Sequence, residues 1–237
     1  MMMYHWRFGI KKLGVMISVV GSSFDDVDLP VSTQSAVTRG LAAFASNVNA
    51  VVVSSGLDQG VSKLIGDSAA SLQGDHDVPF VGVAAWDTVM GNRTLRANAL
   101  GADDTSIVDY NPDSGGSQQA AVAAPLQQHH SHFIFVDSRS QGGKSYSGEK
   151  PVRSRVEASF VSLLKIPLVL VVIGGGVGTL HTVSQALKAG HPVILVRFCH
   201  FSIIWSLFPS FCHFFHHFLF AGRGQRWHRR CDRKCVE

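Results

Sequence analysis

Six short apolar runs alternate with stretches of helical periodicity along the first 197 residues of the chain. The runs predict strands, and the first of them, which is nearly continuous and apolar, predicts a strand buried on both faces, as is typical of parallel sheets. They cover residues 13–20, 50–54, 79–84, 133–137, 168–173 and 192–196. Between them, apolar residues recur three or four positions apart, which predicts helices. These helices centre on residues 31–46, 61–72, 152–163 and 180–187.

Strands that alternate with helices at this spacing are typical of a parallel sheet wrapped by helices. We therefore expect one α/β domain over residues 1–197, a Rossmann-like three-layer parallel sheet with helices on both faces. Residues 85–128 do not follow this rhythm, and their Asn111-Pro112-Asp113 sequence favours a turn. They are predicted to form an irregular surface excursion beside the site, partly mobile.

The charge of the chain is concentrated in its last 40 residues, 198–237. These carry six Lys and Arg against two Asp and Glu, a net of +4 that equals the formal charge of the whole chain. The remainder is balanced, so the basic overall composition does not predict a nucleic-acid partner for the folded part. All four cysteines also lie in these 40 residues, and a body without cysteine fits a reducing compartment.

Residues 198–220 are apolar and aromatic, long enough to span a bilayer, and a basic cluster follows them. Taken literally, this tail is a C-terminal membrane anchor with its basic end in the cytosol. A proline and four histidines within it are costly in hydrocarbon. The abrupt change after the sixth strand favours a translated intron or a frameshift as the source of the tail.

The strongest candidate site is the turn after the fifth strand, which contains Gly174, Gly175, Gly176, Gly178 and Thr179. In parallel α/β sheets, ligands bind outside the carboxyl ends of the strands. Glycines let the backbone approach a ligand closely, and exposed amides at the next helix start attract phosphate. Thr179 can cap that helix or donate a hydroxyl. The alternative is a tight strand–helix turn that binds nothing, but four glycines in five positions favour a binding turn.

Two other loops have the same strand-to-helix location and small residues. Gly21 and Ser22 follow the first strand, and Ser55 and Gly56 follow the second. Alone, each would be an ordinary turn. Together with the glycine turn they place three small-residue loops along one sheet edge, and we expect them to line one ligand cleft.

The loop after the fourth strand offers charged groups to the same edge. Asp137 could hold a ribose hydroxyl or merely cap the following loop, and Lys144 could reach a phosphate. His129, His130 and His132 precede this strand, but no cysteine or clustered carboxylate accompanies them. A structural role is therefore favoured over a zinc site, and no metal or cofactor is predicted.

Residues 130–137, 143–149 and 169–180 resemble the N-terminal cytosolic domain of melastatin-type (TRPM) transient receptor potential channels, which belongs to the SLOG superfamily, also called LSDAT. The resemblance covers roughly residues 13–197, with a poor match across 90–128. It implies the SLOG form of the Rossmann-like fold and a cytoplasmic domain of a membrane channel. It also implies two partners, a small nucleotide-like ligand such as ADP-ribose and other channel subunits.

The same superfamily includes phosphoribohydrolases that release cytokinin bases. Their signature is a proline, two glycines, any residue, glycine and threonine, with a glutamate three residues later. Here Gly174 stands in the proline's place and Thr182 in the glutamate's, and threonine cannot do a carboxylate's proton or charge work. The resemblance therefore implies a nucleotide-sensing regulatory domain without catalytic residues. A base hydrolase using Asp137 or Glu149 is one alternative, and an assembly domain that binds no ligand is another.

Overall fold

The computed structural model describes residues 13–22, 30–72, 78–99, 107–114, 123–137 and 149–196. Two compact units divide the chain after Arg197, and every described residue belongs to the first. Lys144 and the apolar and basic tail lie outside the described residues, so the predictions made for them stay predictions. In the described part, no helix combines the length and the apolarity needed to cross a membrane.

The six predicted strands form one sheet, and every pair of neighbours in it is parallel. The strand order is β4-β3-β2-β1-β5-β6, so β1 lies inside the sheet. The strands are β1 (Val15–Gly21), β2 (Ala50–Ser54), β3 (Phe80–Ala85), β4 (His132–Val136), β5 (Leu168–Ile173) and β6 (Val193–Val196). Each lies within two residues of its predicted position. The central strands β1, β2 and β3 are mostly buried, whereas the edge strands β4 and β6 are partly exposed.

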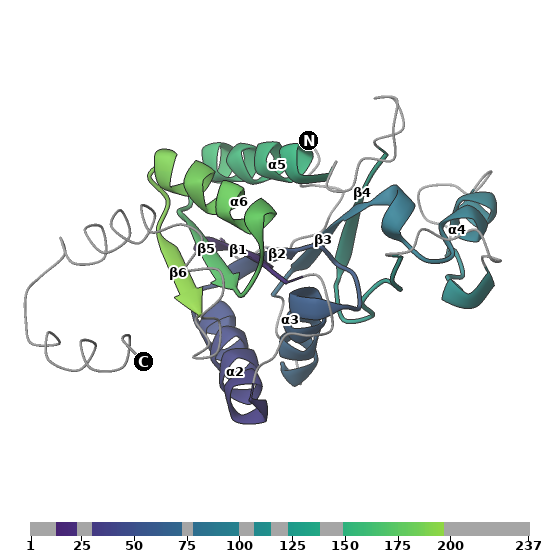
Figure 1. Ribbon diagram of the computed structural model, residues 1–237, viewed down its shortest axis with the longest axis horizontal. Coiled ribbons are helices and arrows are strands. Elements are labelled where there is room, and N and C mark those ends of the chain that lie inside the picture. The colour runs from purple at the N-terminus through teal and green to yellow at the C-terminus, as the bar shows by residue number, and fades with distance from the viewer. Residues whose placement is uncertain are drawn as a thin grey trace, which may run out of the picture. The chain divides into compact units, whose positions relative to one another are not determined.

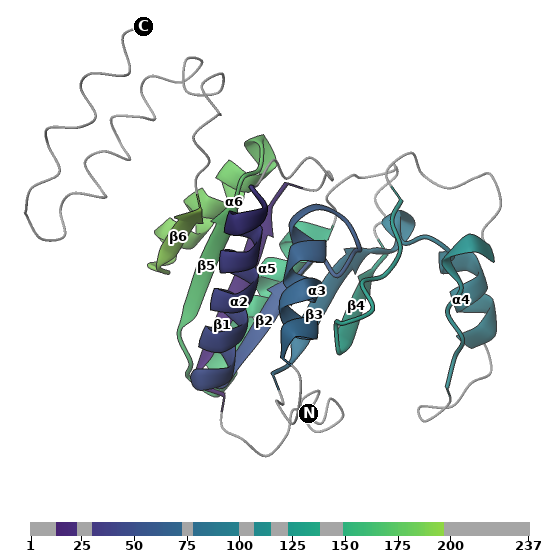
Figure 2. The same cartoon turned by 90° about the horizontal axis from the view of Figure 1, so that it is seen from below.

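Helices cover both faces of the sheet, which confirms the three-layer Rossmann-like architecture. Figures 1 and 2 show α2 and α3 on one face, and α5 and α6 on the other. The helices are α2 (Val31–Asn47), α3 (Gly60–Ser71), α4 (Asn92–Ala99), α5 (Glu149–Leu164) and α6 (Val177–Lys188). Both views place α4 beyond the β4 edge, apart from these layers.

The core lies along β1, β2 and β3, where Ile17, Val52 and Val83 are at most 1% exposed. The helix stripes read from the sequence are less uniformly buried. Phe160 on α5 is buried, but Leu163, predicted on the same stripe, is 74% exposed. Periodicity therefore located the helix correctly but did not show how far the helix extends over the sheet.

The excursion at residues 85–128 contains more regular structure than its turn-rich sequence predicts. Helix α4 lies inside it, and the pattern missed this helix because Leu95 is its only large apolar residue. Val89 and Ala124 pack with Leu57 and Ala84 in a small cluster over the carboxyl ends of β2 and β3. The two ends of the excursion are thus anchored beside the predicted ligand loops.

Helix α6 begins at Val177, three residues before the periodic stripe predicts. The turn out of β5 is already complete by Gly176, the N-cap residue, so Gly178 and Thr179 lie inside the first helical turn. At the other end, Gly190 has φ of 75°, and the amides of Gly190 and His191 donate to Leu187 and Ala186. This is a Schellman arrangement, and it agrees with the predicted capping role of Gly190.

Candidate functional site

The strand order reverses at β1 and β5, which places two predicted loops side by side. The chain proceeds from β1 to β4 on one side and then crosses to β5 on the other. Gly21 is in register with Ile173, and the Ser22 amide donates to the Ile173 carbonyl at 3.3 Å. Loops that leave such a switch point toward opposite faces open a crevice where ligands bind in parallel α/β folds. The structure therefore brings the Gly21–Ser22 loop and the glycine turn together.

The four glycines of the turn have different reasons to be glycine. Gly174 and Gly175 have φ of 61° and 109°, a left-handed conformation that other residues rarely adopt. Gly176 is extended, with φ of −119°, and a Cβ built on it meets no atom within 4 Å. A Cβ at Gly178 meets only the flexible end of Lys150, with Nζ at 2.5 Å. Backbone conformation thus explains Gly174 and Gly175, with the Thr179 side chain also excluding a Cβ at Gly175, whereas Gly176 leaves an open approach to the backbone.

The amino end of α6 carries uncompensated positive character. Gly176 makes no side-chain cap, and the first turn contains no acidic residue. The amides of Val177 and Gly178 belong to the first turn, whose N–H groups have no intrahelical acceptor. Within the described residues, no loop or cap acceptor takes either of them. Such an end attracts anions.

Thr179 does not cap α6, contrary to one of its two predicted roles. The helix starts at Val177, so Thr179 is the third helical residue and Gly176 occupies the cap. The side chain of Thr179 folds back over Gly175, where any Cβ would collide with it. Its hydroxyl remains at the turn, in the place that the donor role requires.

Two cations reach the carboxyl edge from the first turns of α5, and the sequence analysis did not single them out. Lys150 places its Nζ beside Gly178, at the positive end of α6. Among the described residues it has no carboxylate partner. A lysine at a helix amino end is electrostatically unfavourable unless an anion lies between them. This pair of positive features lies at the turn for which a phosphate was predicted, and the phosphate itself stays a prediction.

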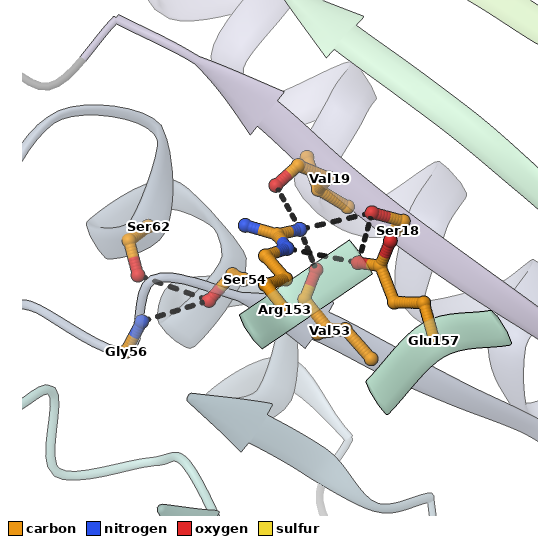
Figure 3. A network of polar contacts seen from close by, with 8 residues as sticks. All are labelled: Ser18, Val19, Val53, Ser54, Gly56, Ser62, Arg153 and Glu157. Atoms are coloured by element: carbon orange, nitrogen blue, oxygen red, sulfur yellow. Dashed lines mark hydrogen bonds and ion pairs between the residues drawn. The ribbon is translucent and has the colours of Figure 1, made fainter. Parts of the chain in front are cut away.

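Arg153 lies against β1 and β2, where it contacts Ser18, Val19 and Val53 (Figure 3). Its Nε contacts Glu157 Oε1 at 2.8 Å, and its Nη2 donates to the hydroxyl of Ser18 at 2.9 Å and to the carbonyls of Val19 and Val53 at 2.9 and 3.0 Å. Ser18 donates in turn to Glu157 Oε1 at 2.6 Å. The other terminal nitrogen of Arg153 has no marked contact with the residues drawn in Figure 3. The ion pair is nearly buried, with side chains 11% and 12% exposed.

Helical spacing is the signal that could have found this polar face. Lys150, Arg153 and Glu157 stand at positions i, i+3 and i+7, which lie on one side of a helix. The apolar positions of α5, which predict the helix, do not include these three charged residues. A charged stripe at a helix that starts beside a glycine turn would have been the better guide.

Close packing already requires glycine at two of the other predicted positions, Gly21 and Gly56. A Cβ at Gly21 would lie 2.6 Å from Val61 Cγ2 and would collide with the Ile173 carbonyl. Gly56 has φ of 73° and faces Gly82, whose Cα lies 2.6 Å from the position a Cβ would take. Ser55 follows β2, one strand from Ser22, so the sheet brings these loops together as predicted. The chemistry of Ser55 and Gly56 toward a ligand stays a prediction.

Asp137 is not brought to the glycine turn. It follows β4, at the edge of the sheet, four strand steps from β5. With strands about 4.8 Å apart, the two loops are separated by roughly 19 Å. Thr182, in the place of the hydrolase glutamate, donates its hydroxyl to the Gly178 carbonyl at 3.3 Å. Neither position supplies an acid beside the glycine turn.

Of the three histidines at the start of β4, the structure buries His130. His130 is 6% exposed, and its Nε2 lies 2.7 Å from the Ser54 hydroxyl. Its Nδ1 has no partner within the described part of the chain, and no group of three metal ligands occurs there. Burial, and secondarily the neighbouring His129, lowers the pKa of His130 to about 4.

The buried neutral His130 should make the fold sensitive to mild acid. Its pKa is depressed on folding, so its contribution to stability is complete above the unfolded value near 6.5 and is lost as pH falls toward about 4. The loss of unfolding free energy over that window should be about 3 kcal/mol. Urea denaturation at pH 7 and pH 4.5 measures it. His130→Gln should flatten this pH dependence, and the exposed His181→Gln should not; equal slopes in all three proteins would refute the assignment.

Comparisons with known proteins place this geometry in a family. The model of the family described as "SLOG in TRPM" matches residues 1–199. The chain is 31% identical over 211 residues to the transient receptor potential cation channel subfamily M member 2 of Rattus norvegicus, covering 83% of this chain and 13% of that protein. It is 28% identical over 202 residues to the trpm channel of Drosophila melanogaster, covering 81% of this chain and 9% of that protein. The chain thus spans about an eighth or less of the length of these channels.

Among solved structures, the comparison matches the molybdenum cofactor carrier protein of Chlamydomonas reinhardtii, at 18% identity and a TM-score of 0.44. The match covers 88% of this chain and 86% of the carrier. The family model, by contrast, spans the whole α/β sheet described above, from before β1 to beyond β6. The chain belongs to the family of SLOG domains found in TRPM channels.

Proposed function

We propose that this domain is a regulatory sensor of an anionic nucleotide derivative of the ADP-ribose type, acting as a cytoplasmic part of a TRPM-like cation channel. One observation carries the proposal. At the β1–β5 switch point, the open Gly176 backbone, the uncapped amino end of α6 and the Lys150 side chain converge on one place.

Each part of the proposed site has a separate role. The amides of Val177 and Gly178 hold the phosphate, and Lys150 neutralises its charge. Thr179 supplies a hydroxyl donor beside Gly175. The Gly21–Ser22 loop forms the opposite wall of the crevice. Arg153 supports the floor, because its guanidinium binds the carbonyls of Val19 and Val53 at the ends of two strands.

Binding without catalysis fits these residues better than base hydrolysis. A hydrolase of this architecture needs a carboxylate beside the glycine turn. Asp137 lies about four strand spacings away, roughly 19 Å, and Thr182 is neutral. Glu149, the first residue of α5, does not stand in the glutamate position of the hydrolase signature, and an assay for free base released from AMP tests it. We therefore expect the chain to bind a nucleotide without releasing its base, and partners in a channel would respond to that occupancy.

Lys150→Gln tests the charge at the centre of the site. We expect it to weaken ADP-ribose binding about tenfold, because a charge-assisted phosphate contact contributes about 1.5 kcal/mol. Calorimetric titration of the full chain with ADP-ribose, AMP and inorganic phosphate measures the effect.

Lys188→Gln is the matched control for this variant. It removes the same charge on the same face of the sheet, but at the last residue of α6, roughly 16 Å along the helix from Val177. Affinity should be unchanged in this control. Equal losses in both variants would show a general effect of net charge, and no loss in Lys150→Gln would remove Lys150 from the site.

A further inference from the structure

Residues 124–130, here called the strap, form a continuous set of contacts with the loop between β2 and α3. The Asp58 amide donates to the Pro125 carbonyl at 2.8 Å, and the Gln127 amide donates to the Gly56 carbonyl at 2.9 Å. Leu57 and Leu126 form an antiparallel bridge. The strap therefore fixes the loop that holds the predicted site residue Gly56, from the side away from the crevice.

Gln127 is the centre of the strap. It is 2% exposed, and its side-chain oxygen accepts from the His129 amide at 2.7 Å. Its amide group lies so close to α3 that a Cβ at Gly66 would collide with it. His130 follows, with Nε2 2.7 Å from the Ser54 hydroxyl, which also accepts from the Gly56 amide at 3.2 Å. Because the Gln127 side chain is buried and packed against Gly66, this contact holds the strap in one position along α3.

The contacts continue from the loop to the crevice. Ser54 lies 3.0 Å from the Ser62 hydroxyl in the first turn of α3. In that same turn, the Val61 amide donates to the Ser22 carbonyl at 3.0 Å. The Ser22 amide in turn donates to Ile173, the last residue before the glycine turn. Hydrogen bonds and packing thus run without a gap from the strap to the switch point.

We propose that the strap is a positioning element of the ligand site, with Gln127 and His130 as its positioning residues. It holds the β2–α3 loop and, through the first turn of α3, the Ser22 carbonyl beside the glycine turn. The inference rests on the proposed function for its ligand, but the positioning itself does not need one. None of the strap residues touches the glycine turn in the contacts above.

Gly66→Ala tests the strap without altering a residue of the crevice. Its methyl group should displace the Gln127 side chain and loosen the strap. In the full chain we expect hydrogen–deuterium exchange of the Asp58 and Gln127 amides to accelerate at least tenfold, and that of Val61 to accelerate as well. ADP-ribose affinity should fall severalfold. Gly40→Ala, at a helix position with no neighbour within 4 Å, is the matched control and should change neither.

The double variant Gly66→Ala/Gln127→Ala separates the clash from the loss of the Gln127 side chain. The alanine at 127 vacates the space that the new methyl group needs but also removes the side chain that holds the strap, so exchange at Asp58 and Val61 should stay faster than in the wild type and match that of Gln127→Ala alone. If Gly66→Ala alone does not fold, hydrogen–deuterium exchange of the same amides is measured in Gln127→Ala, where it should also accelerate. Unchanged exchange at Val61 in the loosened strap would overturn the proposal, since it would confine the strap's effect to its own contacts.

The calorimetric titration with ADP-ribose distinguishes a failure of this inference from a failure of the proposed function. A wild-type chain that binds no nucleotide defeats the proposed function, while the exchange rates still decide whether the strap positions Ser22. Normal affinity in a variant with accelerated Val61 exchange would overturn the strap's role in the site.

Discussion

Glu157→Ala should lower the free energy of unfolding by about 3 kcal/mol, the largest stability effect expected in this domain. The substitution leaves the Arg153 guanidinium nearly buried without its counter-charge, and removing one partner of a buried pair typically costs about 3–5 kcal/mol. The remaining acceptors, Ser18 and two strand carbonyls, retain part of the contacts and place the loss at the lower end. Urea denaturation of the full chain at pH 7 measures it.

Two further variants of α5 provide comparisons for the loss of unfolding free energy in Glu157→Ala. Glu157→Gln keeps an acceptor for the Ser18 hydroxyl but removes the charge, so its loss should be intermediate. Arg155→Ala removes an exposed arginine from the same helix and should change stability by less than about 0.5 kcal/mol. If Glu157→Ala cost no more than Arg155→Ala, the network in Figure 3 would not be a buried ion pair in solution.

Gly176→Leu should abolish nucleotide binding with little effect on the fold, weakening ADP-ribose affinity roughly a hundredfold. The side chain would occupy the open approach to the amides of Val177 and Gly178, and losing two charge-assisted hydrogen bonds corresponds to about 3 kcal/mol. The extended backbone of Gly176 accepts any residue, so thermal unfolding should stay cooperative. Calorimetry and a melting curve on the same sample measure both quantities.

The matched control is Gly40→Leu, because Gly40 also has no atom within 4 Å of a built Cβ. It adds the same apolar surface to helix α2, on the opposite face of the sheet from α6 (Figure 1). Binding should be unaffected. Retention of full affinity by Gly176→Leu would mean that the glycine turn is only a tight turn, the alternative that the sequence left open.

The sheet could be predicted from the sequence because its strands are short, mostly apolar runs that alternate with helical stripes. A run such as residues 168–173 has no polar face, so burial in the middle layer is its one stable location, and β5 was found at the predicted residues. The glycine turn and its proximity to Gly21 followed from the rule that parallel strands end at one edge. The strand order itself decides which loops meet, and the periodicity of the chain does not contain it.

Because the strand order cannot be read from the periodicity, Asp137 was expected close to the glycine turn. Asp137 ends a strand as expected, but β4 lies at the far edge, so the aspartate is distant from the glycine turn. Lys150 and Arg153 were missed because their roles depend on how α5 crosses the sheet, a tertiary property. Gly21 and Gly56 were read as ligand approaches, whereas close backbone packing already requires glycine at both positions. The sequence alone does not distinguish a glycine required by a ligand from a glycine required by a neighbouring strand.

The central claim is that backbone amides at the amino end of α6 hold an anionic nucleotide, and an NMR titration of the isotope-labelled full chain with ADP-ribose tests it most directly. The account predicts saturable shifts centred on the amides of Gly176, Val177 and Gly178, with smaller changes at Ser22. Shifts confined to the loop after β4, or none at millimolar ADP-ribose, would contradict it.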